Sequence, residues 1–144
     1  IALSVAGIGV FLGAILAPYG VAKFGRHRWI KFAMFASAAA PLILAASQTE
    51  IALSVTAFLA SFFGQNIKVT NDALVQSKID DYYRGRVFAV YDVVVNGAIV
   101  SGGLIAALLL PTSGLTPNVP LVVSAAYLLV AVVVLRTAKF KAIY

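Results

Sequence analysis

The stretch Gln65–Asn96, QNIKVTNDALVQSKIDDYYRGRVFAVYDVVVN, is a charged segment with long apolar runs on both sides. Its charged residues are Lys68, Asp72, Lys78, Asp80, Asp81, Arg84, Arg86 and Asp92. Charges inside otherwise apolar segments are expensive, so a chain keeps them where its fold or its function uses them. What this segment does therefore depends on the surroundings that the rest of the chain builds.

The composition of the chain is that of an integral membrane protein. Of its 144 residues, 62% are hydrophobic and 11% are charged, whereas a soluble domain carries about 25% charged residues. So few charges could not cover the surface of a soluble fold of this length. Cysteine is absent, which excludes disulfides, thiol chemistry and cysteine-based metal sites.

Five apolar segments are long enough to cross a bilayer as helices. They cover approximately residues 1–22, 29–47, 51–77, 87–110 and 119–135. The expected fold class is therefore all-α and integral to the membrane, with about five transmembrane helices. Because the chain opens with Ile directly into an apolar run, without a basic leader, we expect residues 1–144 to be one partial transmembrane domain of a longer chain.

Basic residues predict the orientation of these spans. The links at residues 48–50 and 111–119 contain no Lys or Arg, whereas the alternate turns and the C-terminal end are basic. Cytoplasmic loops carry an excess of Lys and Arg, so we expect a multi-pass protein of the cell membrane whose segment starts outside and ends in the cytoplasm. The net charge of +6 then reflects orientation and contact with anionic lipid, not nucleic-acid binding. The basic clusters are Lys23, Arg26, Arg28 and Lys31; Lys78, Arg84 and Arg86; and Arg136, Lys139 and Lys141.

The first basic turn, GVAKFGRHR at residues 20–28, resembles the loop signature of the major facilitator superfamily. In that signature a Gly and an Asp precede a basic residue, any residue, a Gly and two more basic residues. Here Ala22 replaces the Asp and His27 takes the last basic position. A generic basic turn on the cytoplasmic side is the alternative interpretation. The residues that carry the resemblance are Lys23, Gly25, Arg26 and Arg28.

The second basic turn, DDYYRGRVF at residues 80–88, resembles the stretch before helix 11 in drug- and siderophore-exporter-like members of the same superfamily. A helix start followed by cytoplasmic arginines is again the alternative. Two such turns in this order imply helices 8–12 of a twelve-helix transporter, part of its C-terminal six-helix bundle, with the N-terminal half missing. The residues that carry this resemblance are Asp81, Arg84, Gly85 and Arg86.

A group of polar residues lies inside the predicted third and fourth spans. At about 1.5 Å per residue, Asp92 lies roughly 10 Å in from Arg86, and Lys68 roughly 15 Å in from Lys78. On the third span the steps of three, four and four residues place one set on a single helix face: Gln65, Lys68, Asp72 and Gln76, with Asn71 beside them. Asp92 and Asn96 are four residues apart on the fourth span.

These polar residues have two interpretations. The candidates for ion coupling or gating are Asp72, Asp92, Lys68, Asn96, Gln65 and Asn71. In the functional interpretation they line a hydrated vestibule open to the cytoplasm, where a carboxylate titrates or ion pairs open and close. In the structural one, Lys68 and Asp72 form a fixed pair and Asp92 anchors neighbouring helices.

The resemblance implies a secondary active transporter that exports small molecules by alternating access, an antiporter with protons as the expected coupling ion. Its other partners would be the lipid bilayer and a small-molecule substrate. The chain shows no nucleotide loop, no metal pair and no activated nucleophile, so we expect no cofactor, no metal and no enzyme activity. The alternatives are a non-transporting membrane subunit or scaffold, and a lipid-modifying enzyme built on the turn at residues 80–86.

Overall fold

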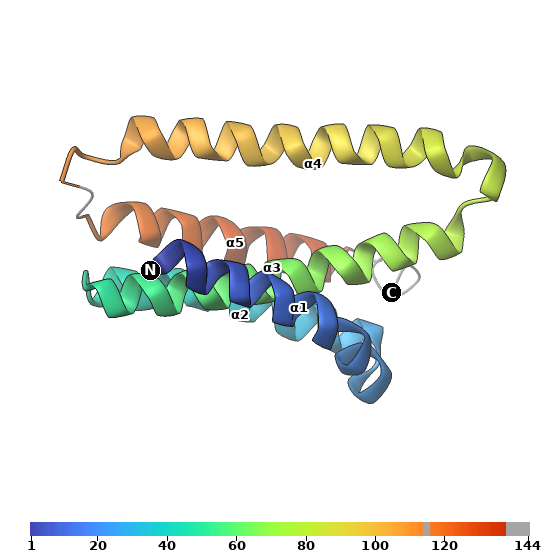
Figure 1. The fold of residues 1–144 in the computed structure, drawn as a ribbon, viewed down its shortest axis with the longest axis horizontal. Coiled ribbons are helices and arrows are strands. Elements are labelled where there is room, and N and C mark those ends of the chain that lie inside the picture. The colour runs from blue at the N-terminus through green and yellow to red at the C-terminus, as the bar shows by residue number, and fades with distance from the viewer. Residues whose placement is uncertain (114–115, 138–144) are drawn as a thin grey trace.

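The computed structural model describes residues 1–113 and 116–137, and its regular structure there is entirely α-helical. The chain runs back and forth, so the α1–α2 and α3–α4 turns lie at one end of the molecule (Figure 1). The α2–α3 and α4–α5 links lie at the other end. Lys139 and Lys141, part of the third basic cluster, fall outside the described residues. The helices are α1 (Ala2–Phe24), α2 (Arg26–Ala46), α3 (Glu50–Lys78), α4 (Asp81–Leu109) and α5 (Asn118–Arg136).

Within the described ranges, four helices are long and apolar enough to cross a membrane: α1, α2, α4 and α5. Helix α3 has 29 residues, but its polar residues between Gln65 and Gln76 lower its mean hydropathy. Helix α4 begins at Asp81, inside the stretch that the sequence assigned to the preceding turn. The all-α membrane fold predicted from the sequence is confirmed.

Helix α3 lies against α1 through a row of small residues. Gly9 and Gly13 of α1 are buried in this contact. A Cβ atom on Gly9 would lie 2.6 Å from the carbonyl oxygen of Phe58, and one on Gly13 would lie 2.5 Å from that of Phe62. The two backbones therefore approach too closely for any side chain larger than hydrogen, as in other close helix contacts of membrane proteins.

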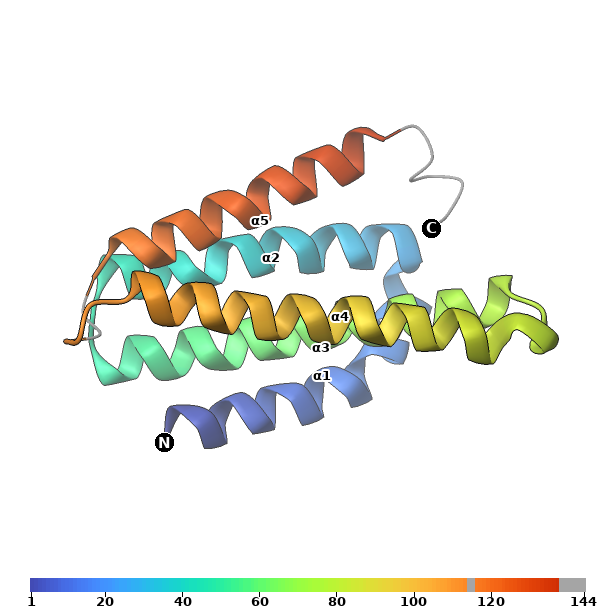
Figure 2. The ribbon, with the colours of Figure 1, turned by 90° about the horizontal axis from the view of Figure 1, so that it is seen from above.

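Helix α2 packs against both α3 and α5 (Figure 2). Pro41 interrupts the backbone hydrogen bonds of α2, because it has no N–H. Near it the Thr56 hydroxyl of α3 donates to the carbonyl of Ala40 at 3.2 Å, and the Ser124 hydroxyl of α5 donates to the carbonyl of Ala38. Neighbouring helices thus bond to two carbonyls close to the proline, whereas the carbonyl that loses its helical donor is that of Ser37.

Each turn at the basic end has its own stabilising contacts. Gly25 joins α1 to α2 with a φ of 80°, a conformation that favours glycine. At the α3–α4 turn, Arg84 Nη2 donates to the carbonyls of Gln76 and Ile79 at 3.2 and 3.4 Å, and lies 2.5 Å from an Asp81 carboxylate oxygen. The guanidinium therefore binds carbonyls that a helix C-terminus leaves without donors.

Helix α4 lies apart from the other four helices. Figure 1 shows it separated from the bundle along its length, and none of its residues is buried. A helix that is apolar all round normally lies in lipid or within a larger protein. Its polar residues, Asp92 and Asn96, are exposed in this structure.

We predict that Gly9→Ala destabilises the protein, whereas Gly7→Ala does not. Both changes add one methyl group to α1, but a Cβ on Gly7 meets nothing within 4 Å. The added Cβ at Gly9 must displace the α3 backbone, which we expect to cost about 1–3 kcal/mol of unfolding free energy. Thermal unfolding of the intact protein in detergent measures this difference. Equal stabilities for the two variants would show that α1 and α3 do not touch at Gly9.

We also predict that Arg84→Gln loosens the α3–α4 turn, while Arg86→Gln leaves it unchanged. Both variants remove one positive charge, but only Arg84 has a hydrogen bond or ion pair in the described structure. Loss of about 1 kcal/mol of local stability is expected, because the group is partly exposed. Hydrogen–deuterium exchange at the end of α3 and the start of α4 is the measurement. If exchange is equally fast in both variants, the guanidinium contacts do not hold this turn.

Candidate functional site

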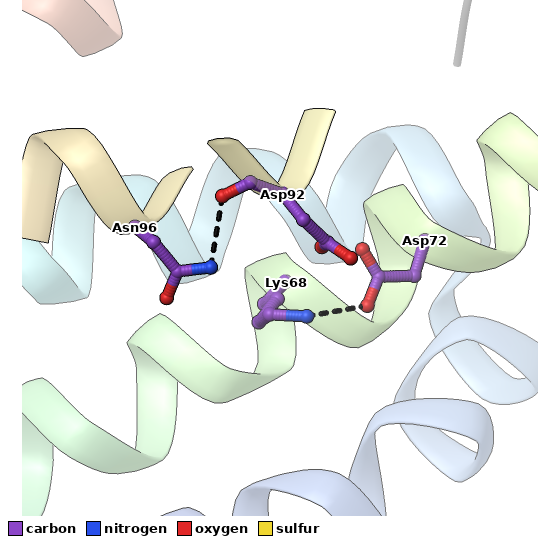
Figure 3. Close-up of polar contacts among 4 residues, drawn as sticks. All are labelled: Lys68, Asp72, Asp92 and Asn96. Carbon is purple, nitrogen blue, oxygen red and sulfur yellow. Dashed lines mark hydrogen bonds and ion pairs between the residues drawn. The ribbon is translucent and has the colours of Figure 1, made fainter. Parts of the chain in front are cut away.

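An ion pair on α3 forms the centre of the candidate site. Lys68 Nζ lies 2.8 Å from Asp72 Oδ2, as the spacing of four residues predicts (Figure 3). The Lys68 side chain is 43% exposed and that of Asp72 is 25% exposed. The second carboxylate oxygen, Asp72 Oδ1, is buried without a hydrogen-bond partner. One oxygen of this carboxylate therefore has no hydrogen-bond donor in the described structure.

Asp92 lies on α4, across from this pair. In Figure 3 its side chain points from α4 toward Lys68 and Asp72. Asn96 Nδ2 donates to the Asp92 main-chain carbonyl at 2.8 Å, which leaves the Asp92 carboxylate out of that bond. In the part of the chain described, the hydrogen bonds and ion pairs of these four residues each stay within one helix. The lysine thus has one carboxylate partner on its own helix and a second carboxylate facing it from α4.

The other predicted residues of α3 have different surroundings. Gln65 is partly buried, and its Cβ lies against the position where Gly13 would carry a side chain. Asn71 is also partly buried, beside Asp72. Gln76 is exposed, and its main-chain carbonyl accepts the bond from Arg84. Gln65 therefore borders the contact with α1, and Gln76 belongs to the α3–α4 turn.

Asn66 is not among the polar residues predicted from the sequence, although it is the most enclosed polar side chain of α3. Asn66 is 0% exposed, and its Nδ2 donates to the Phe62 carbonyl at 2.8 Å. The Thr70 hydroxyl donates to the Asn66 carbonyl at 2.7 Å, while Asn66 Oδ1 is buried without a partner. The signal in the sequence is the spacing of four residues between Asn66 and Thr70, which marks a second polar face next to the one that carries Lys68.

The two loop motifs lie at the same end of the molecule, as the alternation of basic turns predicts (Figure 1). The first turn joins α1 to α2 and the second joins α3 to α4. Lys23 Nζ lies 5.4 Å from the centre of the Phe24 ring, and the Phe24 ring stacks on Trp29. Lys23, Gly25, Arg26 and Arg28 form the first motif; Asp81, Arg84, Gly85 and Arg86 form the second.

Chemically, the site offers two carboxylates and one amine on two facing helices. Carboxylates in a membrane can accept and release protons, and an amine can exchange between two such partners. Among the described residues, no group of three or more His, Cys, Asp or Glu is arranged to hold a metal ion. The two carboxylates and the amine are therefore the charged groups that the candidate site offers.

Comparisons with known proteins identify the family of the chain. The sequence profile described as Major Facilitator Superfamily matches residues 1–142. Uncharacterised MFS-type transporters of Mycobacterium bovis and Mycobacterium tuberculosis are each 34% identical to the chain over 122 residues, which is 85% of this chain and 27% of the relative's length. No solved structure matches significantly. Because the family profile covers nearly the whole chain, the chain belongs to the Major Facilitator Superfamily of membrane transporters.

Proposed function

We propose that the chain is part of a proton-driven exporter of small molecules that works by alternating access. Membership of a transporter superfamily supports this proposal, although the chain covers 27% of the length of the two relatives. The observation that carries it is the ion pair of Lys68 with Asp72, whose second oxygen has no partner, beside the facing carboxylate of Asp92. Charged groups in such a position mark ion pathways and proton relays in membrane proteins.

The proposed orientation places the basic turns in the cytoplasm of a cell-membrane protein, with the start of the segment outside. This orientation follows from the excess of Lys and Arg at the α1–α2 and α3–α4 turns. Lys68 and Asp92 then lie about 10–15 Å from the cytoplasmic surface, by the helical rise. Protons would reach them through a hydrated space between α3 and α4.

Proton uptake changes the balance of charges between the two helices. With both carboxylates ionised, Lys68 holds Asp72 on its own helix, and Asp92 faces the pair as a second negative charge. Protonation of Asp72 frees the amine of Lys68 to pair with Asp92, which draws α4 toward α3. Protonation of Asp92 instead removes the charge that attracts the amine across the gap. Alternation between these two pairings is the proposed link between the proton and the movement of the helices.

The alternative is a membrane subunit without transport, in which the same residues serve assembly alone. The close α1–α3 packing and the buried Asn66 show that this segment does have residues devoted to helix contacts. Asp92 distinguishes the alternatives, because it is exposed and its carboxylate has no structural bond in the described chain.

We predict that Asp92→Asn removes the pH dependence of transport, because the amide cannot exchange a proton. The intact protein is reconstituted in proteoliposomes, and efflux of fluorescent amphipathic dyes is measured across a series of external pH values. Asp80→Asn is the matched control, since Asp80 is an exposed carboxylate in the α3–α4 turn. An unchanged pH profile for Asp92→Asn would exclude Asp92 from coupling.

A second prediction separates a working ion pair from a structural one. Asp72→Asn alone leaves Lys68 without its ion-pair partner and should destabilise the protein, whereas Lys68→Gln combined with Asp72→Asn should keep its unfolding free energy within about 1 kcal/mol of the original. We expect the double variant to fold but to lose gradient-driven dye efflux. Thermal unfolding and efflux are measured on the same preparation. A stable double variant with full efflux would make the pair purely structural.

A further inference from the structure

A second candidate site lies at the end of the molecule opposite the basic turns. A cavity of about 460 Å³ opens there between α2, α3 and α5, next to the α2–α3 and α4–α5 links. Its volume falls within the range of about 300–1,000 Å³ that is typical of small-molecule sites. None of the residues proposed for coupling lines it. The walls are largely apolar, with Leu53 of α3 and Val123 of α5 among them.

One wall of the cavity contains a buried hydroxyl without a hydrogen-bond partner. Ser37 of α2 lines the cavity, is 4% exposed, and its hydroxyl is buried without a hydrogen-bond partner. Pro41, one turn further on, has no N–H to donate to the main-chain carbonyl of Ser37. Buried polar groups are almost always hydrogen-bonded. An unpaired hydroxyl beside a carbonyl that lacks its helical donor therefore indicates a site for a hydrogen-bonding ligand.

Two neighbouring carbonyls of α2 accept hydrogen bonds from other helices. Ala40 receives the hydroxyl of Thr56, and Ala38 receives the hydroxyl of Ser124. Helices α3 and α5 thus bond to two carbonyls that precede the proline, but neither helix bonds to the hydroxyl of Ser37, which lines the cavity.

The other end of the cavity is acidic. Glu50, the first residue of α3, lines the cavity and is exposed. Among the described residues, no Lys, Arg or His lines it. Because the walls carry one carboxylate and no cation, the cavity favours a positively charged ligand over a neutral or negative one.

The separation of the two polar ends follows from the helices. The bond between Thr56 and Ala40 places these two residues at the same level. Glu50 lies six residues before Thr56 on α3, and Ser37 lies three residues before Ala40 on α2. Because α2 and α3 run in opposite directions, these two offsets add, and the ends are about 14 Å apart along the helices. A ligand of drug-like length spans this distance.

We propose that this cavity binds an amphipathic ammonium ion, with its charged end at Glu50, its apolar body between α3 and α5, and a hydrogen-bonding group at Ser37. The site does not depend on the proposed transport function, since it shares no residue with the coupling group. It is also distinct from a site for a lipid chain, which would need neither the carboxylate nor the hydroxyl.

The test compares three probes that differ by one group each. The first is 4-(4-hydroxyphenyl)butylammonium; the second replaces its ammonium with a neutral alcohol, and the third, 4-phenylbutylammonium, lacks the phenolic hydroxyl. Binding to the intact protein in lipid nanodiscs is measured by isothermal titration calorimetry. We expect the first probe to bind about tenfold more tightly than either of the others.

Variants then assign each preference to a residue. Glu50→Gln should remove the preference for the ammonium and keep that for the hydroxyl, and Ser37→Ala should do the reverse. The Ser37 hydroxyl has no partner in the structure, so its removal should leave thermal stability unchanged. Leu53→Trp should weaken all three probes by filling the cavity. Asp80→Asn, a carboxylate at the opposite end, should change none of them.

Three results would overturn the proposal. The first is absence of binding by the first probe to the unchanged protein. The second is equal affinity for the ammonium and the alcohol, which is the result expected of a cavity that holds a lipid chain. The third is binding that ignores the cavity residues, because the probe would then bind elsewhere. Either a preference for the ammonium that survives Glu50→Gln or unweakened binding to Leu53→Trp would be such a result.

Discussion

The contact between the glycines of α1 and the backbone of α3 fixes how closely these two helices approach each other. In a bilayer, apolar side chains gain little by leaving lipid for each other, so close backbone approach is a main source of attraction between helices. Gly9 and Gly13 permit that approach, and Asn66 is enclosed beside it. With α3 held in this way, its buried polar face is fixed toward the bundle, and Lys68 remains on an accessible side.

Local sequence patterns predict much of this structure because they depend on single helices. Runs of apolar residues predict five helices, the alternation of basic turns predicts which turns share an end, and a spacing of four residues predicts the ion pair of Lys68 with Asp72. The small residues Gly9 and Gly13 of α1 permit a close helix contact. They do not predict that α3 is the partner, because the spacing on one helix contains no information about its neighbour.

Features that arise from several helices could not be predicted in this way. The unpaired hydroxyl of Ser37 becomes apparent only when the bonds from Thr56 and Ser124 are known. Those bonds join residues 16 and 86 positions apart in the chain. The cavity has the same origin, because its walls come from three helices and two links. The burial of Asn66 could not be predicted for a related reason. Its neighbour Gln65 fits the face of Lys68, and only the packing of α1 decides which of the two is enclosed.

Helix α3 connects the two candidate sites physically. Thr56 lies at the level of the cavity, and Lys68 lies twelve residues further along the same helix, about 18 Å away. A ligand that displaced α3 from α2 would first have to break the bond between Thr56 and Ala40, and a helix transmits such a displacement along its axis. The glycine contacts with α1 resist that movement, since they leave no space for the backbones to come closer. Binding at the cavity can therefore influence Lys68 in two ways. Helices α1 and α3 can move together as one unit against α2 and α5, or α3 can slide along its own axis against the glycines of α1.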